Sequence, residues 1–143
     1  MKSSPARIVV IEDNAADVQL LDYALSRHGK PYELEVLMDG EEALQFVEEH
    51  RAGKRSSEPC VIVLDLHLPR YDGMAVLSAI KCEPVLAHIH VIVLSSLATP
   101  EEERQLTEMG VRLYETKPMT LEELTAVAGR ILDVCGEPVA AAA

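Results

Sequence analysis

Three short runs of consecutive apolar residues each end on polar side chains. The runs are residues 8–11, 61–64 and 91–94, and the groups that follow them are Glu12-Asp13, Asp65 and Ser95-Ser96. A run that is apolar at every position is typical of a strand in a parallel sheet that helices cover on both faces. The carboxyl ends of such strands lie along one edge, where open α/β sheets bind their ligands. We therefore expect these polar groups to meet in one site.

Strand and helix patterns alternate along the rest of the chain. The pattern predicts helices from Asn14 to about His28 and over 40–51, 73–82, 100–109 and 121–135, and further strands over 33–37 and 111–114. Residues 33–37 alternate polar and apolar positions, which is typical of an edge strand. The predicted fold is α/β, a doubly wound (βα)5 domain with five parallel strands in the flavodoxin-like order 2-1-3-4-5. Residues 52–59 are expected to form a surface loop.

The length and charge of the chain limit the possible functions. Its 143 residues suffice for one domain, which we place over 1–143 with a core over 7–135 and a frayed tail over 136–143. Asp and Glu number 24 against 13 Lys and Arg, so the formal charge of −11 argues against nucleic-acid or anionic-membrane partners. No stretch approaches the roughly 20 apolar residues of a membrane span. We expect a soluble protein.

The cysteines bear on the cellular compartment. Cys60, Cys82 and Cys135 are odd in number and widely spaced, and two of them lie in or beside apolar segments. We interpret them as unpaired, buried small hydrophobes, which fits a reducing cytoplasm.

Carboxylates dominate the predicted site. Asp65 follows a strand that is apolar throughout, while Glu12 and Asp13 follow another, and Mg²⁺ prefers such oxygen ligands together with phosphate oxygens. Lys117 lies just past the last predicted strand, where its ammonium group could bind a phosphoryl oxygen, and Ser95 offers a hydroxyl donor. Each residue taken alone also has an ordinary explanation as a helix cap, a turn residue or a solvated charge.

Taken together, these residues resemble the receiver domain of bacterial two-component response regulators across 7–135. The resemblance implies that Asp65 accepts a phosphoryl group and that Lys117 contacts it. It also implies that Asp13 and Asp65 ligate Mg²⁺ directly, that Glu12 acts through water, and that the backbone carbonyl of His67 completes the protein ligands. Ser95 and Tyr114 correspond to the switch residues of the family. A cis bond at Lys117-Pro118 is implied as well.

Within that family the chain is similar to the small stand-alone regulators paired with phytochrome-type histidine kinases. That similarity lies in residues 10–14, in residues 65–73 and in the loop before the third strand. The expected partners are a histidine kinase, a downstream protein and a second copy in a homodimer. His67 and Leu97 flank the path of the hydrolytic water in receiver domains, and an apolar Leu97 predicts slow self-dephosphorylation.

Three alternative functions fit the sequence less well. A Mg²⁺-dependent phosphatase with an aspartyl-phosphate intermediate would need a second carboxylate two residues after the nucleophile, where His67 stands. A nucleotide-binding module would need a glycine-rich phosphate loop, and neither G-x-G-x-x-G nor G-x-x-x-x-G-K-[ST] occurs. A receiver that works without phosphorylation would usually lack parts of the site, which this sequence keeps. We therefore expect a signalling domain rather than an enzyme.

Overall fold

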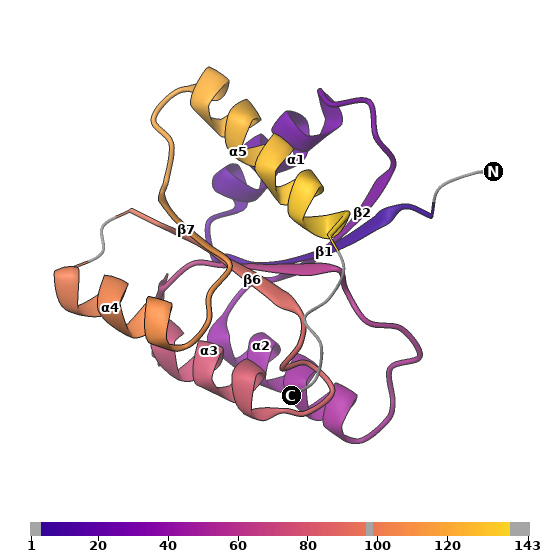
Figure 1. Cartoon of the computed structure of the whole chain (residues 1–143), viewed down its shortest axis with the longest axis vertical. Coiled ribbons are helices and arrows are strands. Elements are labelled where there is room, and N and C mark those ends of the chain that lie inside the picture. Colours follow the sequence, from indigo (N-terminus) through magenta and orange to yellow (C-terminus); the bar gives the residue numbers. More distant parts are fainter. Residues whose placement is uncertain (1–3, 97–98, 138–143) are drawn as a thin grey trace.

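The computed structural model describes residues 4–96 and 99–137. A five-stranded parallel sheet runs through the middle of the molecule, and a helix follows each of its strands (Figure 1). The strands are β1 (Ala6–Ile11), β2 (Tyr32–Leu37), β3 (Val61–Leu64), β6 (His90–Ser95) and β7 (Leu113–Thr116). The helices are α1 (Ala15–Ser26), α2 (Gly40–Arg51), α3 (Gly73–Cys82), α4 (Pro100–Glu108) and α5 (Leu121–Cys135). The predicted (βα)5 alternation is confirmed.

The sheet has the predicted topology. Its strands lie in the order β2-β1-β3-β6-β7, and all four pairings are parallel, so the order of the main strands is 2-1-3-4-5. Helices α1 and α5 cover one face, and α2, α3 and α4 cover the other (Figure 1). No helix in the described part of the chain is long and apolar enough to cross a bilayer.

The core explains why the central strands lack polar alternation. In β1, Val9 and Ile11 pack toward α2 and α3, whereas Ile8 and Val10 pack toward α1 and α5. Both faces are therefore apolar, as a strand covered on both sides requires. Strand β2 is only partly buried, because it has one neighbour and lies at the predicted edge.

Helix starts are fixed by side-chain caps. At each of the five, a side-chain oxygen accepts a hydrogen bond from a backbone N–H of the first turn, which satisfies a donor that the helix leaves unpaired. The capping residues are Asn14, Asp39, Asp72, Thr99 and Thr120. Helix α4 is the most loosely embedded, because Leu106 alone is buried among its nine residues, all of which are described.

Two local features differ from the sequence prediction. The last strand is Leu113–Thr116 rather than 111–114, because the N–H of Val111 bonds to the carbonyl of Leu106 and belongs to the end of α4. A two-stranded hairpin of β4 (His67–Leu68) and β5 (Tyr71–Asp72) also follows β3 and was not predicted. Each of its strands has two residues, which is too short for a repeating pattern of hydrophobic positions in the sequence.

The prediction of three unpaired, buried cysteines is wrong. Cys60 and Cys135 are half-buried and form a disulfide, with their Cα atoms 5.0 Å apart, while Cys82 is exposed. The physical reason is topological. Each helix runs back against its strand, so the end of α5 returns to the sheet edge at which β3 begins.

The expected frayed tail lies mostly outside the described residues, which stop at Glu137. Glu137 itself is held in place, because its carboxylate forms an ion pair with Arg112 at 2.8 Å.

A buried histidine in α2 predicts that the protein loses stability in acid. His50 is 4% exposed and packs against Phe46, and its Nε2 has no hydrogen-bond partner among the described residues. Burial, with a smaller contribution from Arg55, lowers the pKa of His50 below its ordinary value of 6.5. Just below pH 6.5, His50 therefore binds a proton more readily in the unfolded chain than in the folded chain. The free energy of unfolding falls as pH falls.

We expect the free energy of unfolding of His50→Leu to drop less than that of the wild type between pH 7.5 and 5.5, as measured by urea denaturation. Equal drops would show that His50 is not a source of acid sensitivity.

Candidate functional site

The carboxyl ends of the central strands gather the predicted site residues. The N–H of Asp65 donates to the carbonyl of Ile11 at 3.0 Å, and the N–H of Lys117 donates to the carbonyl of Ser95 at 2.8 Å. The sheet ladder therefore continues one residue beyond the strands. As a result, the backbone positions of Asp65 and Lys117 are fixed by the same hydrogen bonds that hold the sheet.

Three carboxylates form one cluster at this edge. Oxygen atoms of Glu12, Asp13 and Asp65 all lie within 4.8 Å of one another. Glu12 and Asp65 are each 6% exposed, whereas Asp13 faces solvent. The donor set and spacing fit a hard divalent cation such as Mg²⁺, which takes one or two carboxylates and keeps positions for water or phosphate. The structure thus brings the three predicted acidic residues together.

Burial sets the protonation of Glu12. Loss of solvent, together with the nearby charge of Asp65, raises the pKa of Glu12 to about 7, although the hydrogen bond from Lys117 opposes the shift. One Glu12 oxygen also accepts the N–H of Asn14 at 3.1 Å.

Lys117 is the cation that neutralises the cluster. Its ammonium group lies 2.8 Å from Glu12, 3.0 Å from Asp65 and 3.0 Å from Asp17. Burial favours the neutral amine, but these three carboxylates outweigh it and raise the pKa of Lys117 above its ordinary value. The side chain is therefore a fixed positive charge that touches the carboxylate of Asp65.

Sequence reasoning missed Asp17. It lies in the first turn of α1, where an acidic residue has an ordinary role opposite the helix dipole. No helical spacing connects it to the acidic pair, because Asp13 precedes the cap residue Asn14 and lies outside the helix.

The loop after β3 presents Asp65 in a defined orientation. The N–H of His67 donates to Asp65 Oδ1 at 2.9 Å, and Lys117 holds Oδ2. Gly73 anchors the other end of this loop, because a Cβ there would lie 2.3 Å from the carbonyl oxygen of Leu66. The side chain of His67 is exposed, but its backbone is beside the carboxylate cluster.

Ser95 and Tyr114 belong to one face of the sheet. Ser95 is fully buried. It lies two residues after Val93 in β6, so both side chains are on the face of the sheet that α3 and α4 cover. Tyr114 pairs with Val93 in the sheet register, is half-buried, and packs against the same cluster as Leu106 of α4. The two predicted switch residues thus lie on the same face of the sheet.

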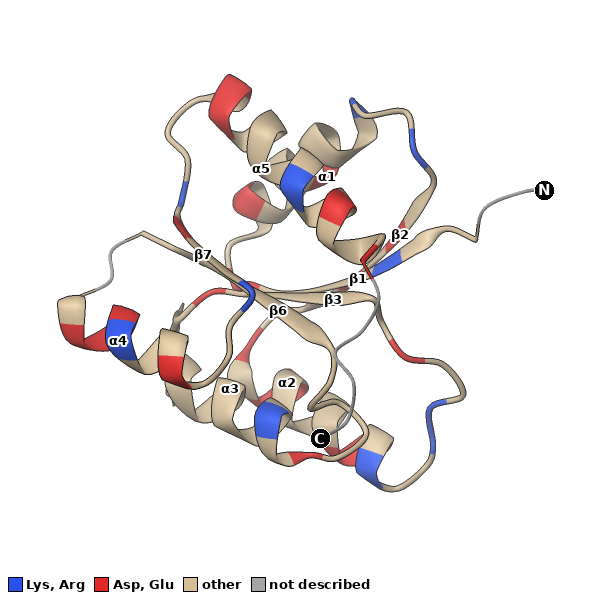
Figure 2. Cartoon of the chain, in the orientation of Figure 1, with Lys and Arg blue, Asp and Glu red and all other residues tan. Residues whose placement is uncertain are grey.

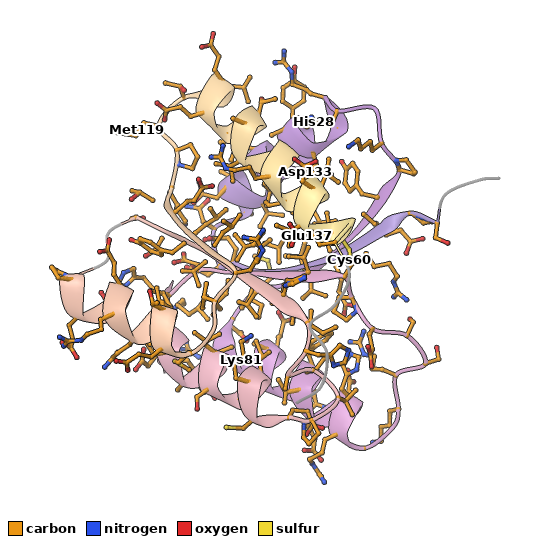
Figure 3. The ribbon with its side chains drawn as sticks, viewed as in Figure 1. His28, Cys60, Lys81, Met119, Asp133 and Glu137 are labelled. Atoms are coloured by element: carbon orange, nitrogen blue, oxygen red, sulfur yellow. A yellow bond between two sulfur atoms is a disulfide. The ribbon has the colours of Figure 1, made fainter. Side chains whose placement is uncertain are left out.

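The segment after Lys117 differs from the expectation. The described residues contain no cis peptide bond, so Lys117-Pro118 is trans and the implied cis bond is wrong. Trans is the isomer of lower energy for X–Pro bonds. Met119 is 95% exposed and points away from the body of the domain (Figure 3). Leu97, the other residue expected near the phosphoryl group, lies outside the described residues.

Comparison with known proteins agrees with this geometry. The family model of the response regulator receiver domain matches residues 8–128. The chain belongs to this family, whose members act as phosphoryl-accepting signalling domains. Within it, the predicted similarity to phytochrome-associated response regulators is confirmed.

Response regulator Rcp1 of Synechocystis sp. is 34% identical over 124 residues, covering 86% of this chain and 84% of Rcp1. A probable methanogenesis regulatory protein, FilR2 of Methanothrix harundinacea, is 38% identical over 120 residues, covering 84% of this chain and 77% of FilR2.

Two solved structures share the fold closely. The phosphorylated cyanobacterial phytochrome response regulator RcpA superimposes with a TM-score of 0.83 at 31% identity, covering 95% of this chain and 99% of RcpA. The Mn²⁺-bound form of Rcp1 gives a TM-score of 0.81 at 33% identity, covering 97% of this chain and 100% of the other. A divalent metal is thus present in a relative of the same fold.

The carboxylate geometry predicts which acidic residues hold a metal. Asp13→Asn should weaken Mg²⁺ binding by at least about tenfold, because it removes a negative ligand from the cluster. Asp17→Asn is the matched control and should have a much smaller effect, since Asp17 contacts Lys117 and is not one of the clustered carboxylates. Isothermal titration calorimetry measures both affinities. Equal losses in the two variants would contradict this division of roles.

Proposed function

We propose that this protein is a response regulator that accepts a phosphoryl group on Asp65 from a histidine kinase, in a Mg²⁺-dependent reaction. One observation carries the proposal: the buried Asp65 carboxylate lies between a lysine ammonium at 3.0 Å and two further carboxylates within 4.8 Å. That arrangement joins a nucleophile, a cation for a phosphoryl oxygen, and ligands for a divalent metal.

The chemistry assigned to Asp65 is nucleophilic substitution at phosphorus. A carboxylate oxygen of Asp65 forms a bond to the phosphorus of a phosphohistidine, the P–N bond breaks, and the electron pair leaves with the imidazole. The product is an acyl phosphate. Asp13, Asp65 and the backbone carbonyl of His67 would hold Mg²⁺, with Glu12 acting through water, and the ion would supply charge neutralisation for this transfer.

Lys117 has two roles in this scheme. Before transfer it orients the carboxylate of Asp65 and reduces repulsion among the acidic groups, as its three ion pairs indicate. After transfer its ammonium group binds an oxygen of the new phosphoryl group as a point charge. Glu12 and Asp17 hold the side chain in place for this second contact.

Ser95 and Tyr114 would transmit the change. The hydroxyl of Ser95 donates to a phosphoryl oxygen, and its movement vacates space into which the ring of Tyr114 can turn. Both residues lie on the face of the sheet that α4 covers, and Tyr114 packs in the same cluster as Leu106, which supports a shift in a pre-existing equilibrium on the α4, β7 and α5 surface.

The expected partners form part of the same proposal. Rcp1 is a response regulator and RcpA is a cyanobacterial phytochrome response regulator, which supports a phytochrome-type histidine kinase as donor. The phosphorylated protein would then signal in the cytoplasm by binding a downstream protein. A homodimer of this chain is a further expected assembly. The first turns of α4 and α5 are acidic, so this surface suits a protein partner and not a nucleic acid (Figure 2).

The phosphatase alternative has less support. It needs a carboxylate two residues after Asp65 to act as a general acid, and His67 there presents a backbone N–H to Asp65 and an exposed side chain. Slow hydrolysis of the acyl phosphate by water, without a dedicated acid, is the expected fate.

Replacing the nucleophile tests the proposal directly. Asp65→Asn should lose Mg²⁺-dependent labelling by radioactive phosphorylated kinase or acetyl phosphate, because the amide oxygen is a poor nucleophile. Asp133→Asn, on an exposed position near the far end of α5, is the matched control and should label at the wild-type level. Circular dichroism must show both variants folded. Full labelling of a folded Asp65→Asn variant would assign the phosphorylation site elsewhere.

Replacing the hydroxyl tests transmission. In Ser95→Ala, beryllofluoride with Mg²⁺ should still shift the amide NMR signals of residues 13, 65 and 117, but the shifts at Tyr114 should weaken because the donor that senses the phosphoryl oxygen is gone. Ser96→Ala is the control, since Ser96 is adjacent and exposed. An undiminished response at Tyr114 in Ser95→Ala would show that the signal takes another route.

A further inference from the structure

A disulfide lies at the sheet edge opposite the carboxylate cluster. Cys60 directly precedes β3, Cys135 is the last residue of α5, and 75 positions of sequence separate them. Cys60 lies beside the end of α5 (Figure 3). The bond therefore joins the end of the last helix to the start of the strand that carries Asp65 at its other end.

Both cysteines are held in place by structure that does not depend on the bond. The N–H of Cys60 donates to the carbonyl of Arg7 at 2.9 Å, which extends the β1–β3 ladder by one residue. Next to Cys135, Leu132 and Val134 are buried in the core between α5 and the sheet. The Cα separation of 5.0 Å lies in the normal range for disulfides, so the fold itself brings the two thiols within bonding reach.

The pair is also accessible to small reagents. Cys60 and Cys135 are half-buried and line an open groove together with Pro5, Lys30, Glu58 and Leu132. A thiolate or a small disulfide can approach the sulfur atoms through this groove without unfolding of the core. Cys82 is different, because it is exposed at the end of α3, on the opposite face of the sheet.

We propose that Cys60 and Cys135 form a reversible thiol–disulfide site that sets how firmly the end of α5 is held. In the oxidising direction, the thiolate of one cysteine attacks a small-molecule disulfide, forms a mixed disulfide and releases one thiol. The second cysteine then attacks its partner's sulfur and releases the other thiol. The protein loses two hydrogens, and the small disulfide is reduced to two thiols. A dithiol reductant reverses both steps.

The contacts near the bond define what reduction changes. Beyond Cys135, Glu137 forms an ion pair with Arg112 at 2.8 Å, and its carboxylate lies 3.8 Å from Nε2 of His90. These contacts are partly exposed and weaker than a covalent link. Reduction therefore leaves the last turn of α5 held by its packing and by these contacts, and that turn opens more often. The carboxylate cluster at the other edge keeps its contacts.

The experiment uses the full chain with Cys82→Ser, so that two thiols remain. After oxidised glutathione, we expect a monomer that is lighter by two hydrogens and has no maleimide-reactive thiol. In native buffer, dithiothreitol should restore both thiols at a rate proportional to its concentration. A lasting glutathione adduct, a disulfide-linked dimer, or reduction that occurs only with denaturant would overturn the proposal.

Hydrogen exchange tests the effect on α5. Reduction should speed exchange of the amides of residues 131–135 by at least tenfold, and Cys135→Ser should show the fast rate whether or not oxidant is present. The Cys82→Ser variant alone, in its oxidised form, should match the oxidised wild type. Equal exchange in the oxidised and reduced protein would show that the bond does not restrain the helix end.

Discussion

The ion pairs of Lys117 are the interaction on which the site depends. Carboxylates within 4.8 Å of one another repel, and burial increases the cost of charging them. One ammonium group placed among Glu12, Asp17 and Asp65 offsets much of that cost, and its pKa stays high because all three contacts favour the charged form. The pKa of Glu12 near 7 shows that compensation is incomplete. The cluster therefore retains affinity for further positive charge, which is the property a metal-assisted phosphoryl acceptor needs.

Backbone hydrogen bonds of the sheet fix the positions of the residues that make these contacts. The N–H of Asp65 donates to the carbonyl of Ile11 and the N–H of Lys117 donates to the carbonyl of Ser95, so Asp65 and Lys117 each lie one residue beyond a strand of the sheet. This is also why much of the site could be predicted from the sequence. An apolar run identifies a central strand, parallel topology aligns the strand ends, and Asp65, Ser95 and the Glu12-Asp13 pair are the residues that follow. Lys117 could be placed by the same reasoning.

The features that the sequence did not reveal depend on contacts between distant segments. Asp17 resembles any acidic residue in a first helical turn until Lys117 is placed beside it. The bond between Cys60 and Cys135 requires knowing that α5 ends where β3 begins. The helix and strand propensities of neighbouring residues do not indicate such long-range contacts.

The shallow attachment of α4 has a consequence for divergence among relatives. Leu106 is the single buried residue of this helix, all of which is described, and seven of its other eight residues are exposed. Substitutions there cost little stability, whereas changes in β1 or β3 disturb a close-packed core. A duplicated gene could therefore acquire a new binding specificity on α4 while its chemistry stays intact, which would allow parallel signalling pathways to separate without rebuilding the domain.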